Sequence, residues 1–256
     1  MVEGILEKQT PTYNLVWIPP RKPVGRILKK EFHQPIPTKT LENIESIATK
    51  NPNARVRLWT DSRRITPGQM NWLDAMVGRH QTGNLVLDDL AAIPAYSSET
   101  FYSHEDTSCN WRLAKHSLIW RQVDSARILA CLQNTLGQTY YSDADITNLL
   151  IDAEEVQTPI RKHGIIVSGM IGEYGSIAYE NQLYGFDQRR RDFFHDLYLD
   201  TLRIAKEEKE NGWQILISRI RKYASTNNIP QKEIVFKPTY DGTEANYSWL
   251  KGRTES

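Results

Sequence analysis

The stretch Thr139-Tyr140-Tyr141-Ser142-Asp143-Ala144-Asp145 decides how the fold is interpreted, because it joins a β-prone run to two carboxylates. Aromatic and β-branched residues favour an extended chain as far as Tyr141. Side chains two residues apart on an extended chain point the same way, so Asp143 and Asp145 share one side. Two carboxylates at a strand end suit a hard cation that takes oxygen ligands. Taken alone, the pattern is more typical of a polar turn, where aspartate is common.

Outward from this stretch, the apolar pattern predicts strands that alternate with helices. The expected strands are residues 13–18, 54–60, 83–87, 163–170 and 176–186. The expected helices are residues 40–50, 113–136 (one helix or a pair), 192–210 and 213–223. Such alternation predicts a layered α/β domain. Because no boundary is visible, we expect a single domain over residues 1–256, within which 192–224 could form a helical subdomain.

The composition is that of an ordinary globular protein, with 39% hydrophobic and 25% charged residues among 256. Lys and Arg number 32 against 31 Asp and Glu, which gives no reason to expect a nucleic-acid partner. The two cysteines, Cys109 and Cys131, have no metal-ligand spacing and favour a reducing compartment. Neither a signal peptide nor a transmembrane segment is recognisable. We therefore expect a soluble protein, or one secreted without a cleavable signal.

Asp124 and Arg127 form a second candidate pair. Apolar residues at helical spacing surround them, so the two side chains share one face of a predicted helix. A surface ion pair of this kind contributes little to stability. A carboxylate beside an arginine also matches a nucleotide sugar, which offers hydroxyl groups and an anionic diphosphate.

The order of these features resembles the metal-dependent GT-A glycosyltransferases, particularly the group of the large clostridial glucosylating toxins. It is also similar to the yeast Och1-like mannosyltransferases. The matching features are Val16-Trp17, Leu58-Trp59-Thr60-Asp61, Asp124-x-x-Arg127 and Asp143-x-Asp145. The resemblance implies a GT-A-like (Rossmann-related) nucleotide-sugar-binding domain with a mixed central sheet and extra helices.

Two further pairs resemble the arginine N-acetylglucosaminyltransferase effectors of enteric bacteria. These pairs are Glu180-Asn181 and, near the C-terminus, Ser248-Trp249. The effectors also carry a histidine upstream of Glu-Asn, where this chain reads Val167-Ser168-Gly169. This departure weakens the case for arginine as the acceptor.

The resemblance implies a role for each matched residue. Trp17 would stack on the nucleobase, and Asp124 with Arg127 would hold the sugar and the diphosphate. The implied donor contacts are Val16, Trp17, Asp124, Arg127, Asp143, Ala144 and Trp249. The implied ligands of Mn²⁺ or Mg²⁺ are Asp143, Asp145, Asn246 and Ser248. Residues 240–256 would form a C-terminal lid that shields the donor from water.

Glu180 and Asn181 are candidates for catalysis together with Asp124 and Arg127. A carboxylate near the reacting carbon can orient the acceptor, take its proton or stabilise an oxocarbenium-like transition state. From the residues alone, an exposed glutamate at a strand end is the simpler interpretation. Residues 189–191, three arginines, fit a solvated helix start or a patch that faces the acceptor.

These observations predict a metal-dependent, retaining glycosyltransferase that uses UDP-glucose or UDP-N-acetylglucosamine. We expect a protein side chain of a host as the acceptor, as for a bacterial effector or toxin. A glycan acceptor, as for the Och1-like enzymes, is the alternative within this class. A non-catalytic nucleotide-sugar-binding module and a metal-dependent phosphohydrolase are the alternatives outside it.

Overall fold

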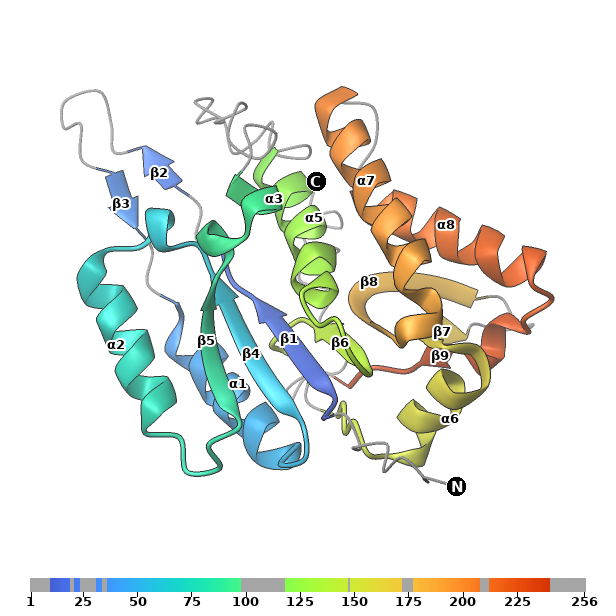
Figure 1. The fold of residues 1–256 in the computed structure, drawn as a ribbon, viewed down its shortest axis with the longest axis horizontal. Helices are drawn as coiled ribbons and strands as arrows, with labels where there is room; N and C mark the ends of the chain where they lie inside the picture. The colour runs from blue at the N-terminus through green and yellow to red at the C-terminus, as the bar shows by residue number, and fades with distance from the viewer. Residues whose placement is uncertain are drawn as a thin grey trace, which may run out of the picture.

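The computed structural model describes residues 10–18, 21–23, 31–33, 36–97, 118–146, 148–171, 177–207 and 212–239. For residues 21–23, 31–33, 118–122, 170–171, 178, 180–181, 204–207 and 212–213 it describes the backbone alone. A central seven-stranded sheet has the order β5-β4-β1-β6-β8-β7-β9 (Figure 1). Its strands are β1 (Thr12–Val16), β4 (Arg55–Thr60), β5 (Leu85–Asp89), β6 (Thr139–Ser142), β7 (Ile165–Ile171), β8 (Ile177–Phe186) and β9 (Val235–Phe236). A separate antiparallel ribbon pairs β2 (Arg21–Pro23) with β3 (Glu31–His33).

The sheet is mixed because β8 runs against both of its neighbours, β6 and β7. The other pairs are parallel: β1 with β4 and β6, β4 with β5, and β7 with β9. The carboxyl ends of β1, β4, β5 and β6 therefore meet at one edge of the sheet. In open α/β sheets this edge is where ligands bind.

Helices cover both faces of the sheet and complete three layers (Figure 1). One hydrophobic core lies under α1 (Thr38–Lys50), α2 (Pro67–Gly78) and α6 (Glu154–His163). The other lies under α5 (Leu118–Leu132), α7 (Arg191–Glu207) and α8 (Gly212–Thr226), with the short α3 (Pro94–Ser97) beside it. Single 3₁₀ turns, η1 (Ser62–Arg64), η2 (Leu90–Ala92), η5 (Gln188–Arg190) and η6 (Gln231–Glu233), connect these elements. No helix within the described residues is long and apolar enough to span a membrane.

The predicted α/β layering is confirmed, but α2 and α6 were not among the predicted helices. The start of α2 does carry a sequence signal. Thr66 and Gln69 form a capping box, in which each side chain accepts a hydrogen bond from the backbone N–H of the other. In α6, Pro159 interrupts the pattern that a helix prediction requires.

Asn14 is a fully buried polar residue that links three strands of the sheet. Its Nδ2 donates to Thr139 Oγ1 at 2.9 Å and to the carbonyl of Tyr140 at 3.0 Å. Its Oδ1 accepts from Trp59 Nε1 at 2.9 Å. Since β4, β1 and β6 are joined through this one amide, Asn14 fixes the strands whose carboxyl ends carry the candidate site.

We expect Asn14→Ala to destabilise the protein by about 1–3 kcal/mol, because Trp59 Nε1 is left buried without its acceptor. Urea unfolding followed by fluorescence measures the loss. Asn53→Ala is the matched control, since Asn53 is exposed and its side-chain amide donates to the Asp152 carboxylate at 2.8 Å, also on the surface. Equal stability of the two variants would contradict a structural role for Asn14.

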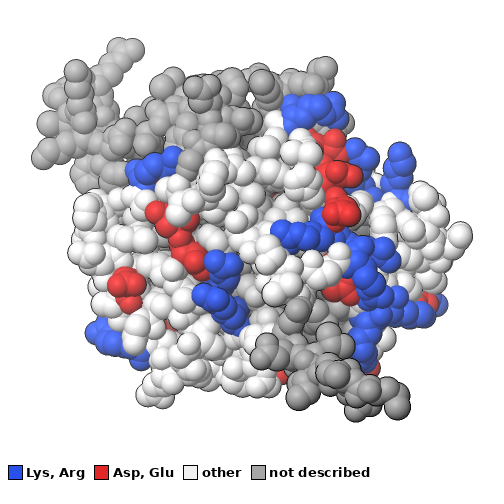
Figure 2. Space-filling view, in the orientation of Figure 1, with Lys and Arg blue, Asp and Glu red and all other residues white. Residues whose placement is uncertain are grey.

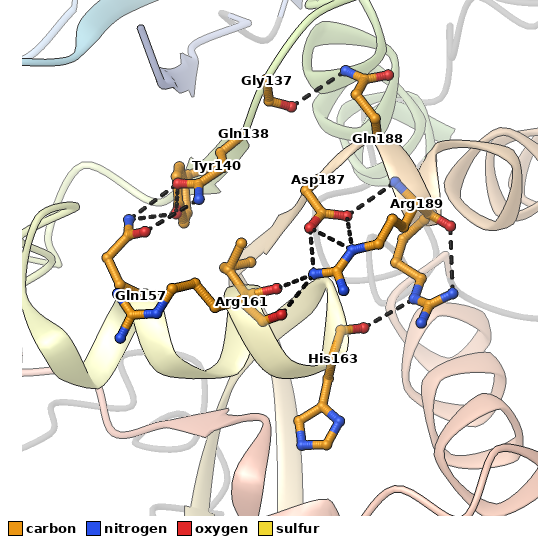
Figure 3. Close-up of polar contacts among 11 residues, drawn as sticks. Gly137, Gln138, Tyr140, Gln157, Arg161, His163, Asp187, Gln188 and Arg189 are labelled. Carbon is orange, nitrogen blue, oxygen red and sulfur yellow. Dashed lines mark hydrogen bonds and ion pairs between the residues drawn. The ribbon is translucent and has the colours of Figure 1, made fainter. Parts of the chain in front are cut away.

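The three arginines at 189–191 bind the carboxyl ends of helices from both faces of the sheet. Arg189 donates to the carbonyls of Ile160 and Arg161 at 2.6 and 3.0 Å, and Arg190 donates to that of His163 at 2.9 Å (Figure 3). These carbonyls belong to the last turn of α6. Cations near a helix carboxyl end are favourable because they meet unpaired carbonyls and the negative end of the helix dipole.

Arg191 binds the opposite layer, where it donates to the carbonyls of Leu132 and Asn134 at the end of α5. In the view of Figure 2, basic side chains gather at the right of the molecular surface, with acidic side chains among them. Asp187 pairs with Arg189, with 2.7 Å between Oδ2 and Nη2. The three arginines lie at the start of α7, and Arg189 is exposed there, as expected for a solvated helix start. Their side chains also hold the carboxyl ends of α5 and α6 in place. A role toward the acceptor stays a prediction.

Candidate active site

A cavity of about 300 Å³ opens at the carboxyl edge of the sheet, between the ends of β1 and β6 and the first turns of α1. Six of its lining residues are apolar and three are polar. They are Leu15, Val16, Trp17, Thr40, Ile44, Leu58, Asp143, Ala144 and Asp145. Residues from the chain ends of β1 and β6, which are more than a hundred positions apart in sequence, thus share one small space.

Trp17 follows directly after β1 and is half-buried. Its backbone N–H donates to the carbonyl of Trp59 at 2.9 Å, which continues the β1–β4 pairing by one residue. Thr40 and Ile44, four residues apart on α1, line the same cavity. A half-exposed indole in a mostly apolar cavity presents a flat surface on which a ring can stack.

Asp143 follows β6 directly and receives two side-chain donors. Arg127 Nη2 lies 3.0 Å from Asp143 Oδ1, and the Tyr141 hydroxyl donates to the same oxygen. Arg127 also pairs with Asp124, with 3.4 Å between Nη1 and Oδ1. The helix α5 therefore delivers one cation that bridges two carboxylates, and the predicted Asp124–Arg127 pair is joined to Asp143.

The charge states of this group follow from its burial. Burial alone would lower the pKa of Arg127, but Asp143, Tyr141 and Asp124 raise it well above its usual value, so the guanidinium stays charged. Burial raises the pKa of the Tyr141 phenol well above its usual range, so it remains a donor to Asp143. Arg127 also lies over the Tyr141 ring, 5.0 Å from its centroid. One oxygen of Asp143 is thus held by two donors that do not titrate near neutral pH.

Asp145 is exposed, and the pKa of its carboxyl group is raised, first by partial burial and then by the negative charge of Asp143. A cation that binds between two carboxylates lining one cavity removes the repulsion between their negative charges. Oxygen donors of this kind fit Mg²⁺ or Mn²⁺, which take one or two carboxylates together with substrate phosphates. Within the described residues, no group of three or more His, Cys, Asp and Glu side chains is arranged so that it could hold a metal ion.

Beside Asp143, the pairing of β7 with β8 is irregular. Val167 pairs with Tyr184 and Gly169 with Tyr179, so the single residue Ser168 stands opposite residues 180–183. This bulge contains Glu180 and Asn181, whose backbone lies in β8. The backbone N–H of Asp143 donates to the carbonyl of Gln182 at 2.7 Å, so the bulge is bonded to the residue after β6. Bulges are frequent next to active sites, where they redirect side chains.

The structure brings most of the predicted site residues to one edge of the sheet. Val16, Trp17, Asp143, Ala144 and Asp145 share the cavity, and Asp124 and Arg127 adjoin it through Asp143. Glu180 and Asn181 lie on the neighbouring strand. Asn246, Ser248 and Trp249, together with the whole of the expected lid at 240–256, lie outside the described residues.

Sequence reasoning missed five residues that belong to this region. Leu15, Thr40, Ile44 and Leu58 line the cavity, and Tyr141 donates to Asp143. The two leucines lie in buried strands and read as core residues. Tyr141 is two residues before Asp143, and alternation along β6 is the signal that could have identified it as a neighbour.

The mixed sheet with helices on both of its faces defines an α/β fold of the GT-A type. Among solved structures, this chain is similar to the PaToxG glycosyltransferase, with a TM-score of 0.53 and 14% sequence identity. The superposition covers 87% of this chain and 71% of the PaToxG chain. A protein described as a transferase matches 91% of this chain and 93% of its own, with a TM-score of 0.52 and 16% identity. At the level of sequence, no family model and no curated protein matches the chain. At these identities, the likeness shows the fold.

Proposed function

We propose that this protein is a metal-dependent glycosyltransferase that moves glucose or N-acetylglucosamine from a UDP-sugar to an acceptor. The observation that carries the proposal is the cavity that Trp17 shares with Asp143 and Asp145. An aromatic surface and a pair of carboxylates are the two features that a nucleoside diphosphate with its cation requires. The GT-A type of fold supports the same conclusion.

The nucleoside is proposed to lie in the cavity, with the base on Trp17 and with Val16 and Ala144 beside it. A volume of about 300 Å³ is at the small end for ligand pockets, so it suits part of the donor rather than all of it. A single-ring base needs less room than a purine, which favours UDP over GDP. Thr40 supplies a hydroxyl group within the same cavity.

Asp143 and Asp145 are proposed to hold Mn²⁺ or Mg²⁺, with Asn246 and Ser248 as further oxygen ligands. When bound, such a cation neutralises the charge that develops on a departing diphosphate. Arg127 and Asp124 adjoin Asp143 and would hold the diphosphate and the sugar hydroxyls. Arg127 supports this role because its charge does not change near neutral pH.

Glu180 and Asn181 are proposed to act on the acceptor side, and Trp249 to close over the donor from residues 240–256. The bulge that contains Glu180 and Asn181 is bonded to Asp143, which supports a position near the reacting sugar. Transfer with retention of configuration and a host protein as acceptor follow from the family resemblance. PaToxG is described as a glycosyltransferase, which supports the same chemistry here.

Incubation with UDP-glucose or UDP-N-acetylglucosamine and Mn²⁺ tests the proposal through the products. A glycosyltransferase without its acceptor releases UDP and free sugar, because the bond to the anomeric carbon breaks. A phosphohydrolase releases UMP and sugar 1-phosphate, and a binding module releases nothing although UDP raises its thermal stability. Intact-mass analysis of candidate host proteins then identifies the acceptor by an added hexose or N-acetylhexosamine.

Trp17→Ala is expected to raise the dissociation constant for UDP about 10- to 100-fold, because stacking of a base on an aromatic ring contributes about 1–3 kcal/mol. Trp17→Phe should retain most of the affinity. Isothermal titration with UDP and Mn²⁺ provides the measurement. Trp72→Ala is the control, since Trp72 is 48% exposed on α2 and does not line the cavity. Unchanged affinity in Trp17→Ala would remove the nucleobase from this position.

A further inference from the structure

Ser168 is a buried hydroxyl residue on β7, at the point where the ladder between β7 and β8 is interrupted. Its side chain is fully inaccessible to solvent. Val167 pairs with Tyr184 and Gly169 with Tyr179. Between these two pairs, β7 has one residue, Ser168, whereas β8 has the residues 180–183. A ladder with such a mismatch leaves backbone groups of the bulged strand without their usual partners.

The Ser168 hydroxyl accepts a hydrogen bond from one of these groups, the backbone N–H of Leu183. Its Oγ lies 3.1 Å from the backbone nitrogen of Leu183, and Leu183 is itself fully buried. An unpaired N–H at this depth is unfavourable, so the bond holds the end of the bulge at Leu183. The serine thus replaces a carbonyl of the neighbouring strand as the acceptor.

The same short segment is bonded to the candidate site on its other side. Leu183 pairs with Ser142 of β6, and the Gln182 carbonyl accepts from the backbone N–H of Asp143 at 2.7 Å. Ser168 and Asp143 therefore bind the N–H and the C=O of a single peptide group, the one that joins Gln182 to Leu183, from opposite sides of β8. Residues 180 and 181 come directly before this group, so their backbone position depends on both bonds.

We propose that Ser168 is a positioning residue, which holds the bulge with Glu180 and Asn181 in register with Asp143. The inference rests on the proposed glycosyltransferase function. Ser168 fixes the acceptor-side segment relative to the donor and the metal, and it contacts neither of them. A displacement of about 1 Å at a reacting group can cost about 100-fold in rate, whereas donor binding by the cavity does not involve β7.

The test separates turnover from donor affinity in Ser168→Ala. We expect kcat for donor hydrolysis, and for transfer once an acceptor is known, to fall about 10- to 100-fold. The dissociation constant for UDP with Mn²⁺ should stay within about threefold, which also shows that the variant is folded. Ser168→Thr keeps an acceptor oxygen and should recover part of the lost turnover.

Thr139→Val is the matched control, because Thr139 is equally buried and its hydroxyl accepts from Asn14 at the far end of β6. It should lose stability without loss of kcat. Wild-type turnover in Ser168→Ala, or an equal loss of kcat in Thr139→Val, overturns the role of Ser168 and leaves the proposed function intact. A wild-type protein that binds no UDP and hydrolyses no UDP-sugar overturns both.

Discussion

Asp143→Asn is expected to lower metal-dependent turnover of the donor by about 100- to 1000-fold while the protein remains folded. The amide keeps an oxygen that can accept from Arg127 and from the Tyr141 hydroxyl, so the local contacts survive. It loses the negative charge that a divalent cation requires. Turnover is measured as UDP released from UDP-glucose or UDP-N-acetylglucosamine at saturating Mn²⁺.

Asp145→Asn should lose turnover to a similar extent, and it should also change the stability of the metal-free protein. Because the pKa of Asp145 is raised in the folded protein, its ionised form is disfavoured there relative to the unfolded chain. The cost is absent below the unfolded pKa and present above the raised one. Removal of the charge should therefore slightly stabilise the metal-free protein at neutral pH and not at low pH.

Asp152→Asn is the control for both variants, since Asp152 is an exposed carboxylate that bonds to Asn53 and does not line the cavity. Its turnover should equal that of the wild type. If Asp143→Asn and Asp145→Asn also turn over the donor like the wild type, the two aspartates do not hold a catalytic cation, and the proposed function fails.

Arg127→Met should cause the largest loss of stability, about 3–5 kcal/mol, together with loss of turnover. Methionine approximates the shape of the arginine stem, but it leaves Asp124 and Asp143 close together without their shared cation. The two carboxylates then repel each other in a largely buried place, where no cation compensates their charge. The deficit is therefore full at neutral pH and shrinks as the pH falls and the carboxylates become protonated.

Urea titrations at several pH values measure this deficit. Arg161→Met is the control, because its ion pair with Glu154 is exposed and should contribute no more than about 1 kcal/mol. Arg127→Lys keeps the charge but not the forked geometry, so it should recover stability more than turnover. A deficit that does not change with pH would show that packing, and not charge, explains the loss.

The sequence predicted the local geometry of the candidate site wherever that geometry depends on a short segment. The β-prone run before Asp143 ends as expected, and β6 covers Thr139–Ser142. The helical spacing of Asp124 and Arg127 placed both on one face of α5, where they form their ion pair. Periodicity and spacing suffice for such features because they depend on a few neighbouring residues.

The rest depends on contacts between distant parts of the chain. Leu15 and Leu58 look like core residues in buried strands, and only the meeting of β1 and β6 with α1 turns them into a cavity lining. The position opposite Ser168 depends on the register between β7 and β8, which no local pattern fixes. In the sequence, Ser168 is notable only because it lies in the segment where the related effectors carry a histidine. In the structure, its hydroxyl accepts a hydrogen bond from the backbone N–H of Leu183.

The arginines at 189–191 make one edge of the sheet more rigidly held than the other. At the amino edge of β6 they cross-link α6 on one face of the sheet to α5 on the other, with Gln188 bound to Gly137 between them. The carboxyl edge contains an open cavity and a bulged ladder instead. The interrupted strand pairing favours local opening at that second edge. We expect fluctuations that admit and release a ligand to occur there, while the opposite end serves as a fixed base.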